Sequence, residues 1–387
     1  MKQADVYVLS SRPARKRKSV LSLYLNVDQS EHGNLNRGFE VQLKEMASSL
    51  RKSLKEGPEG EGLASALHRA VEFVSVYKPE GRGLAVFIDE SDGFLSHKEL
   101  AFPVTNQIRW DRELLLQPLA NAIDELEDYG IVLVDRTKLR VFLVEQGKIE
   151  EVLNKEISGK ETRHVKSTGP DHAESSARTQ RRADNQIRSN LREVVEHVNK
   201  FVKTKHPHRF VLAGTPETLA ELRKLLPTPV ALSVIGETVL AMDASPAKVL
   251  SVAQPLAEAY ERSTEVEKVN GVVTAAAKKG NAVVGLGHTL QAVNSDRVWE
   301  LIYSADFLAP GFECTECSSL FTAETPSCAY CSSRVQPVGN VIERAVAHAL
   351  RKHAKVEVVT GEASAALDNA GGIGAFLKTR TKAVAAL

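Results

Sequence analysis

The feature that most constrains the fold is a long amphipathic segment near the middle of the chain. Between residues 173 and 202, apolar side chains recur at steps of three and four residues, the spacing of one face of an α-helix. These side chains are Ile187, Leu191, Val194, Val195, Val198 and Phe201. Five arginines of the same segment lie mostly off that face: Arg178, Arg181, Arg182, Arg188 and Arg192. The pattern predicts one long helix with an apolar face and a basic remainder.

A polar, turn-rich loop precedes this helix and contains two histidines and a Gly-Pro bend. From Lys160 to Arg192 the chain has eight Lys and Arg residues against four Asp and Glu residues. A basic loop on a basic helix suits an exposed tip directed toward phosphate-rich RNA, and the alternative is an ordinary solvated loop. The candidate RNA-binding residues are Arg163, His164, Lys166, Gly169, Pro170, Asp171, His172, Arg178, Arg181 and Arg182.

The composition limits the classes of partner. With 50 Lys and Arg residues against 49 Asp and Glu residues, the formal net charge is +1, so any RNA contact must come from local patches. The N-terminus has no apolar signal core, and no apolar run approaches the roughly 20 residues of a membrane span. Four cysteines in 387 residues do not make a disulfide scaffold. We expect a cytoplasmic protein with neither a membrane partner nor a DNA partner.

Strand and helix patterns alternate along the chain, which favours an α/β or α+β fold. Apolar runs predict strands at residues 20–27, 83–89, 131–135, 139–144, 147–152, 209–214, 298–303 and 355–359. Periodic segments predict further helices at residues 39–54, 63–77, 114–126, 218–226, 245–262 and 341–353. Thr215 is a suitable N-cap for one of them, with Pro216 at its first helical position. The length suits two or three domains, and we assign three: 1–127, 128–244 and 245–387.

The most specific motif is a pair of cysteine knuckles, Cys314-x-x-Cys317 and Cys328-x-x-Cys331, separated by ten residues. Two such knuckles can present four thiolates tetrahedrally to Zn²⁺. Because four cysteines leave no open ligand position, the zinc should be structural and should hold an insert, about residues 310–338, that is too small for its own core. The alternatives are a redox pair or two disulfides, which a reducing compartment disfavours.

Other motifs point away from catalysis. The glycines from Gly371 to Gly374 precede a strand rather than a helix, so a tight turn explains them better than a nucleotide-binding loop. His164 and His172 have no positioned orienting carboxylate, and we expect them to contact RNA or solvent. A basic run at residues 12–18 is either a solvated arm or a further RNA contact. No hydrolase, metalloprotease, Walker or kinase signature is present, so we assign no catalytic residue.

Several segments together resemble the archaeo-eukaryotic class I release factor and Pelota family, most strongly after the first third of the chain. The strand from Tyr129 to Asp135 with its hairpin resembles the opening strands of the family's middle domain. The basic loop and long helix resemble that domain's tip. Residues 285–293 and 370–374 resemble the third, L7Ae-like domain, which carries an insertion where the cysteines lie. The resemblance implies a three-domain release-factor/Pelota-like architecture, with the first domain toward the decoding centre and the middle domain toward the peptidyl-transferase centre.

The chain departs from this family at the tip. Release factors carry Gly-Gly-Gln there to organise water attack on peptidyl-tRNA, but this chain has no Gly-Gly-Gln and no Asn-Ile-Lys-Ser stop-codon motif. Pro170 in the corresponding loop also removes a backbone N–H and fixes φ. The chain thus looks like the bacterial branch of the Balon type, which acts in ribosome hibernation. We expect a non-enzymatic stress factor that occupies the A site of the 70S ribosome, binds 23S and 16S rRNA, and has elongation factor Tu as a partner.

Two alternatives stay open. The chain could be a peptidyl-tRNA hydrolase or ribosome-rescue factor in which His164 or His172 replaces the glutamine, and a release assay would distinguish this from occlusion. It could also be an RNA-binding adaptor that works away from the ribosome through its L7Ae-like domain. Crosslinking that recovers mainly non-ribosomal RNA would favour the adaptor.

Overall fold

The structure is a computed structural model that describes residues 3–53, 58–157 and 172–378. It is a mixed α/β fold, as predicted, and it divides into two compact units. One unit combines residues 1–125 with residues 262–387, and the other comprises residues 126–261. The assignment of three domains stays a prediction, although residues 1–125 of the first predicted domain and residues 262–387 of the last fall within a single unit. No helix in the described part of the chain is long and apolar enough to cross a membrane.

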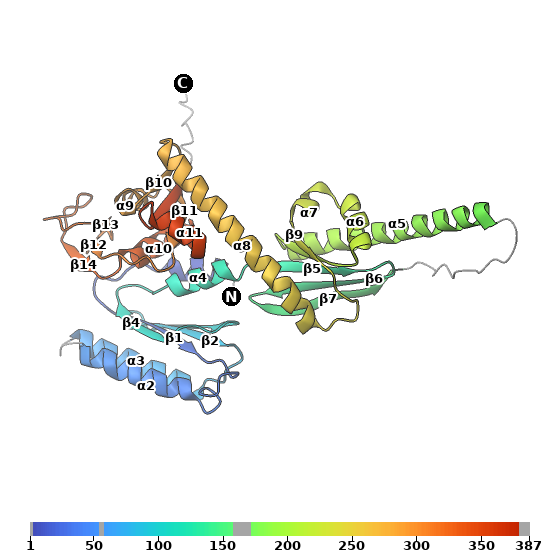
Figure 1. Cartoon of the computed structure of the whole chain (residues 1–387). Helices are drawn as coiled ribbons and strands as arrows, with labels where there is room; N and C mark the ends of the chain where they lie inside the picture. The colour runs from blue at the N-terminus through green and yellow to red at the C-terminus, as the bar shows by residue number, and fades with distance from the viewer. Residues whose placement is uncertain (1–2, 54–57, 158–171, 379–387) are drawn as a thin grey trace, which may run out of the picture. The chain divides into compact units, whose positions relative to one another are not determined.

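The unit of residues 126–261 is built on a five-stranded sheet with the order β7-β6-β5-β8-β9 (Figure 1). Its strands are β5 (Tyr129–Val134), β6 (Lys138–Glu145), β7 (Lys148–Glu156), β8 (Phe210–Gly214) and β9 (Val234–Thr238). Its helices are α5 (His172–Lys205), α6 (Pro216–Leu225), α7 (Thr228–Leu232) and the first part of α8 (Pro246–Ala277). The first three strands form an antiparallel meander, and β5, β8 and β9 run parallel. A parallel pair needs a crossover, which α5 supplies between β7 and β8.

Both faces of this sheet are covered. On one face, Leu191, Val194 and Val198 of α5 are buried together with strand residues. Gly130 permits this close packing, because a Cβ there would lie 2.8 Å from the Phe210 ring. On the other face, side chains from the start of α8 complete a second apolar cluster. The long helix with one buried face is therefore confirmed where its side chains are described.

The other unit contains two larger sheets. The first is antiparallel with the order β3-β2-β1-β4, and the second has the order β10-β16-β11-β15. The elements of the first are α1 (Gln3–Ser10), β1 (Val20–Asn26), α2 (Gly38–Ser53), α3 (Pro58–Val76), β2 (Gly83–Asp89), β3 (Phe94–Leu100), β4 (Gln107–Asp111) and α4 (Gln117–Glu125). Those of the second are β10 (Ala282–Val284), α9 (Leu286–Asn294), β11 (Val298–Ser304), α10 (Val341–Arg351), β15 (Lys355–Val359), α11 (Gly361–Asp368) and β16 (Ile373–Leu377). A small third sheet forms the cysteine insert.

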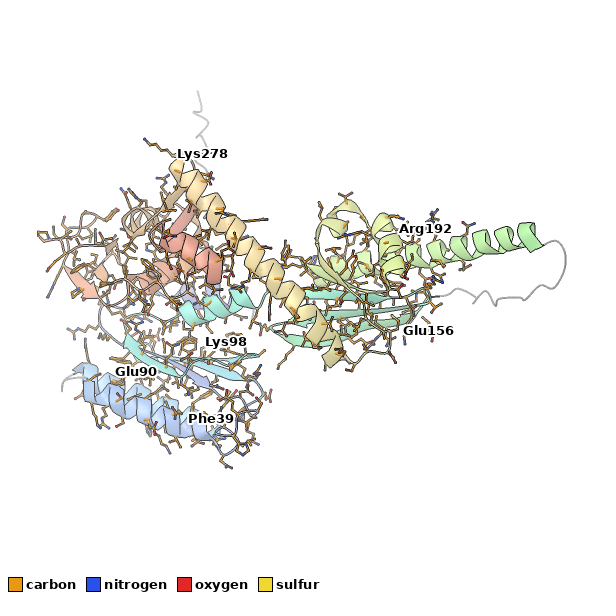
Figure 2. All side chains as sticks on the ribbon, viewed as in Figure 1. Phe39, Glu90, Lys98, Glu156, Arg192 and Lys278 are labelled. Carbon is orange, nitrogen blue, oxygen red and sulfur yellow. The ribbon has the colours of Figure 1, made fainter. Side chains whose placement is uncertain are left out.

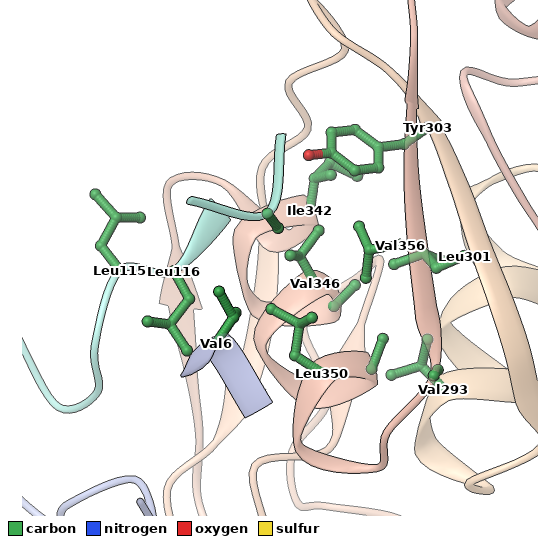
Figure 3. Close-up of a cluster of buried hydrophobic side chains, with 14 of the residues drawn as sticks. Val6, Leu115, Leu116, Val293, Leu301, Tyr303, Ile342, Val346, Leu350 and Val356 are labelled. Carbon is green, nitrogen blue, oxygen red and sulfur yellow. The ribbon is translucent and has the colours of Figure 1, made fainter. Parts of the chain in front are cut away.

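One hydrophobic core joins residues from both ends of the chain in this unit. Figure 3 shows Val6 and Leu116 from the first segment beside Val346 and Leu350 of α10. Tyr303 of β11 also donates a hydrogen bond to the side chain of Asn121 in α4. Since these side chains are fully or nearly fully buried, this shared core packs the two segments together, although each segment also has a smaller core of its own.

Two local predictions have clear outcomes here. Gly371 and Gly372 both adopt positive φ, 103° and 73°, in a turn that leads into β16, which confirms a turn before a strand. The helix predicted to end at residue 262 instead continues to Ala277 with Pro255 inside it. Pro255 is exposed, so the backbone carbonyl that loses its partner can bond to water.

Candidate metal centre and candidate RNA-binding helix

The four cysteines belong to the insert, whose small sheet has the order β13-β12-β14 and contains Cys314, with the other three in the connecting turns. Its strands are β12 (Gly311–Cys314), β13 (Leu320–Phe321) and β14 (Val335–Val338). Cys314 ends β12, and the first knuckle turns the chain back into β13. Cys314 and Cys328 are buried, whereas Cys317 and Cys331 are exposed. The sequence prediction of one four-cysteine cluster is confirmed.

The two knuckles share one backbone design. Each has the sequence Cys-x-x-Cys-Ser-Ser. The cysteine spacing predicted the thiol cluster but did not predict a role for the two serines that follow. In the first, the N–H of Ser318 donates to the carbonyl of Cys314 at 3.2 Å, and in the second, Ser332 donates to Cys328 at 2.8 Å. Ser318 and Ser332 both adopt positive φ, 58° and 61°. This turn folds each chain segment back so that both thiols of a knuckle face the same point.

The sulfur positions fit a tetrahedral metal site. All four Sγ atoms lie within 4.8 Å of one another. The two shortest separations are 3.4 Å between Cys314 and Cys331 and 3.5 Å between Cys317 and Cys328, too long for a disulfide. A Zn–S bond of about 2.3 Å in a tetrahedron places neighbouring sulfurs about 3.8 Å apart. The residues therefore fit Zn²⁺, which would hold the two knuckles together as a structural ion.

The thiols differ in how easily they ionise. Burial raises the pKa of Cys314 and of Cys317 above the ordinary thiol value. Hydrogen bonds from the side chain and the backbone N–H of Ser333 lower the pKa of Cys331 to about 6. Zinc binds thiolates, so Cys331, with its lowered pKa, ionises most easily, and the two thiols with raised pKa, Cys314 and Cys317, would give up their protons on binding.

The insert is tied to the body of its unit by charged side chains. Glu313, buried beside Cys314, has its pKa raised by burial and lies 3.7 Å from Nε of Arg344. The carbonyl of Thr315, inside the first knuckle, accepts a 2.6 Å hydrogen bond from Nη2 of Arg112. The Nε of Arg112 donates to the carbonyl of Arg15, also at 2.6 Å. The first knuckle is thus bonded to two distant segments of the chain.

The helix α5 presents two different halves. Asn190 is buried, and its amide donates a 2.8 Å hydrogen bond to the carbonyl of Arg136 in the β5–β6 turn. Beyond that position the apolar face is packed on the sheet, whereas the N-terminal half of α5 extends past the sheet in Figure 1. Arg188 and Arg192 are exposed, and Figure 2 labels Arg192 on this helix. The sheet holds the C-terminal half, and the described backbone of the N-terminal half, which carries Arg178, Arg181 and Arg182, continues beyond it.

The predicted tip lies largely outside the described residues. Arg163, His164, Lys166, Gly169, Pro170 and Asp171 all precede the described part of α5. His172, Arg178, Arg181 and Arg182 belong to the backbone of α5. The structure therefore places the helix that carries these four residues, and their role in RNA binding stays a prediction.

The basic run at residues 12–18 is partly neutralised. Arg15 pairs with Asp89 at 2.7 Å and with Asp92 at 2.6 Å, and Arg12 pairs with the same two carboxylates. Arg12 also lies 3.8 Å from the centroid of the Phe94 ring. These two arginines fasten the start of the chain to the β2–β3 hairpin. Sequence composition alone could not separate this structural role from RNA binding.

Comparisons with known proteins support one family. Residues 115–258 match the model of bacterial archaeo-eukaryotic release factor family 10. No curated protein matches the chain. Among solved structures, an archaeal translation termination factor, aRF1, has 15% identity, with 98% of each chain covered and a TM-score of 0.27.

Two further solved structures are similar at low identity. The archaeal Pelota of a ribosome-bound model with ABCE1 has 12% identity over 97% of this chain and 94% of that chain, with a TM-score of 0.42. Dom34 of S. cerevisiae, described as a translation termination-like factor, has 11% identity over 77% and 86%, with a TM-score of 0.40. The family match spans the sheet, α5 and the start of α8. Residues 115–258 are thus similar to the bacterial archaeo-eukaryotic release factors, in agreement with the release-factor and Pelota resemblance seen in the sequence.

Proposed function

We propose that this protein is a non-catalytic ribosome-binding factor of the hibernation type, which occupies the A site of the 70S ribosome and blocks translation. The observation that carries the proposal is the two-part construction of α5 in a chain without Gly-Gly-Gln. The similarity of residues 115–258 to a release-factor family supports the ribosome as the partner. Elongation factor Tu is the partner we propose for delivery.

The dimensions of α5 suit a probe that reaches into a narrow site. The helix has 34 residues, which at about 1.5 Å per residue gives a length of roughly 50 Å. Its apolar anchor begins at Ile187, which is partly buried against the core. The stretch from residue 172 to residue 186 therefore extends about 22 Å beyond the anchor. A rigid projection of this length can carry a tip deep into RNA while the sheet stays outside.

The arginine positions of α5 fall on one side of the helix, opposite its apolar face. At about 100° per residue, positions 178, 181, 182, 188 and 192 fall within a sector roughly 120° wide, centred about 150° from the apolar positions. Between residues 178 and 192, Asp184 is the one carboxylate, and its position falls outside the sector. A continuous cationic stripe can follow a phosphate backbone, which fixes orientation without reading sequence. Occlusion requires only such positioning.

Sedimentation with purified 70S ribosomes tests this proposal. Replacing Arg178, Arg181 and Arg182 together with Gln should weaken binding and flatten the slope of its salt dependence by roughly 0.9 for each phosphate that is no longer neutralised. A matched control on the same helix replaces Lys200, Lys203 and Lys205, which are exposed at its other end. Equal binding by the two triple variants, or no co-sedimentation of the unmodified protein, would refute the proposal.

The absence of catalysis needs a separate assay. We expect the protein to release no peptide from ribosomes that carry peptidyl-tRNA in the P site, and to block release by an added factor. Release that disappears when His172 is replaced by Ala would instead establish a hydrolase. That result would leave ribosome binding intact and would overturn the proposed mechanism alone.

A further inference from the structure

An exposed tryptophan marks a surface far along the chain from α5. Trp299 of β11 is 48% exposed, whereas the chain's other tryptophan, Trp110, is 5% exposed. The register between β11 and β16 shifts between Val298 and Glu300, a bulge-like irregularity of the pairing. A bulge changes the direction in which a strand side chain points, and here the irregularity coincides with the exposed indole. Exposure of so large an apolar ring needs an explanation.

One cationic side chain lies over this ring, and further cationic residues lie on the neighbouring segments. Nζ of Lys355 lies 5.3 Å from the centroid of the Trp299 ring. Arg297, two residues before the tryptophan, accepts a 2.8 Å hydrogen bond at its carbonyl from the N–H of Lys378. Lys352 forms an ion pair with Asp296, the residue that precedes Arg297, and therefore lies on the same surface. We call the five exposed residues the Trp299 patch: Arg297, Trp299, Lys352, Lys355 and Lys378.

The carboxylates near this patch have partners of their own. Asp296 binds Lys352 at 2.6 Å and His348 at 3.0 Å. Glu300 is buried, and its carboxylate lies 3.8 Å from Nζ of Lys268 on the α8 side of the sheet. Four exposed cations therefore share one exposed carboxylate. The patch keeps an excess of positive charge around an aromatic face.

We propose that the Trp299 patch binds single-stranded RNA, with one unpaired base stacked on the indole and neighbouring phosphates held by the surrounding cations. Stacking on an aromatic ring needs no particular base, and Lys and Arg beside the ring follow the backbone. A duplex would hide its base faces and leave the indole without its main contact. The site lies in the unit of residues 1–125 and 262–387, so it is independent of α5 and of the proposed A-site function.

Fluorescence gives a local readout, because only two tryptophans are present. In the full-length Trp110→Phe variant, Trp299 is the sole emitter, and a short oligouridylate should quench it. In Trp299→Leu, where Trp110 is the remaining emitter, oligouridylate should cause no quenching, and the affinity measured with labelled oligouridylate should fall roughly 5- to 150-fold. Trp299→Tyr should recover most of the affinity, because it retains a stacking face. This rescue distinguishes loss of stacking from loss of folding.

Charge variants and a competitor complete the test. Lys355→Gln and Lys378→Gln should each lower the salt slope of single-strand binding by about 0.7. Lys224→Gln is the matched control, since Lys224 is an exposed lysine in the other unit. The proposal fails if oligouridylate does not quench Trp299 at low salt. It also fails if oligoglutamate quenches Trp299 at equal or lower concentration, which would assign the patch to an acidic protein segment.

Discussion

Arg344 holds together the two segments that build the larger unit. From α10, its Nη2 binds Asp111 at 2.6 Å and its Nη1 binds Glu113 at 2.8 Å, both from the first segment. Although burial alone would lower it, the carboxylates Glu113, Asp111 and Glu313 raise the pKa of Arg344 above its usual value. We therefore predict that Arg344→Met destabilises this unit more than any single exposed charge replacement.

The magnitude follows from the partners left behind. Asp111 keeps Arg109 at 3.3 Å, and Glu113 keeps Arg351 at 2.7 Å. Glu313 keeps only Arg112, at 4.0 Å. Removing one partner of a buried ion pair costs about 3–5 kcal/mol, and two of three carboxylates retain a second partner, so we expect about 3 kcal/mol. Arg344→Lys retains the charge but not the two-pronged geometry and should cost about 1.5 kcal/mol, one charged hydrogen bond.

Urea denaturation measures this loss selectively. Both tryptophans lie in the unit of residues 1–125 and 262–387, so tryptophan fluorescence reports that unit alone. Burial raises the pKa of Glu313 whereas the Arg344 charge lowers it, so this pKa rises further in Arg344→Met, and protonation as the pH falls stabilises the folded variant more than the unmodified protein. The deficit of Arg344→Met should accordingly shrink between pH 7 and pH 5. The reasoning would be refuted if Arg344→Met lowered the free energy of unfolding by less than about 1 kcal/mol, or if its deficit relative to the unmodified protein grew as the pH fell.

Three further outcomes are expected. Although burial opposes it, hydrogen bonds from Ser91 and Arg15 lower the pKa of Asp89 to about 2. The resulting stabilisation of the folded state, about 2 kcal/mol, is present above pH 4 and is lost as the pH falls to 2. In Asp89→Asn, the free energy of unfolding should therefore change less between pH 4 and pH 2, measured by denaturation at each pH. Arg140 is buried and binds Glu151 at 2.8 Å. Arg140→Ala should lower the free energy of unfolding of the unit of residues 126–261 by about 3 kcal/mol, measured by denaturation monitored with circular dichroism. Cys314→Ser should lower the zinc content, measured by elemental analysis, below that of the unmodified protein.

Local signals in the sequence predicted local structure well. Thr215 caps α6 with its side chain accepting from the N–H of Thr218, and Pro216 is the first helical residue, as expected. The strands at residues 83–89 and 355–359 have the predicted bounds, because each is a short apolar run between breakers. The cysteine spacing likewise determined the cluster, since each knuckle needs only a few residues to close its turn.

Contacts between distant segments could not be predicted in this way. The short helix α1 shows no marked helical periodicity, yet Val6 and Leu9 are buried against residues more than 300 positions away. Asp111 and Glu113 look like ordinary surface charges until Arg344 is placed beside them. The register shift between Val298 and Glu300, beside the exposed Trp299, has no sign in the alternation of apolar residues. Each of these features arises from partners that only the folded chain brings together.

The same long-range contacts extend the influence of the metal site. Because the carbonyl of Thr315 binds Arg112, which also binds the carbonyl of Arg15, the first knuckle and the first segment are ordered together. Without zinc, the four-cysteine insert lacks a core of its own and its turns should loosen. Chelation should then raise amide hydrogen exchange at residues 12–18 and 107–116 as well as within the insert. In Arg112→Met, whose knuckle is already disconnected, chelation should affect the insert alone. If chelation leaves the hydrogen exchange of residues 12–18 and 107–116 unchanged in the unmodified protein, the order of the insert is not coupled to the rest of the fold.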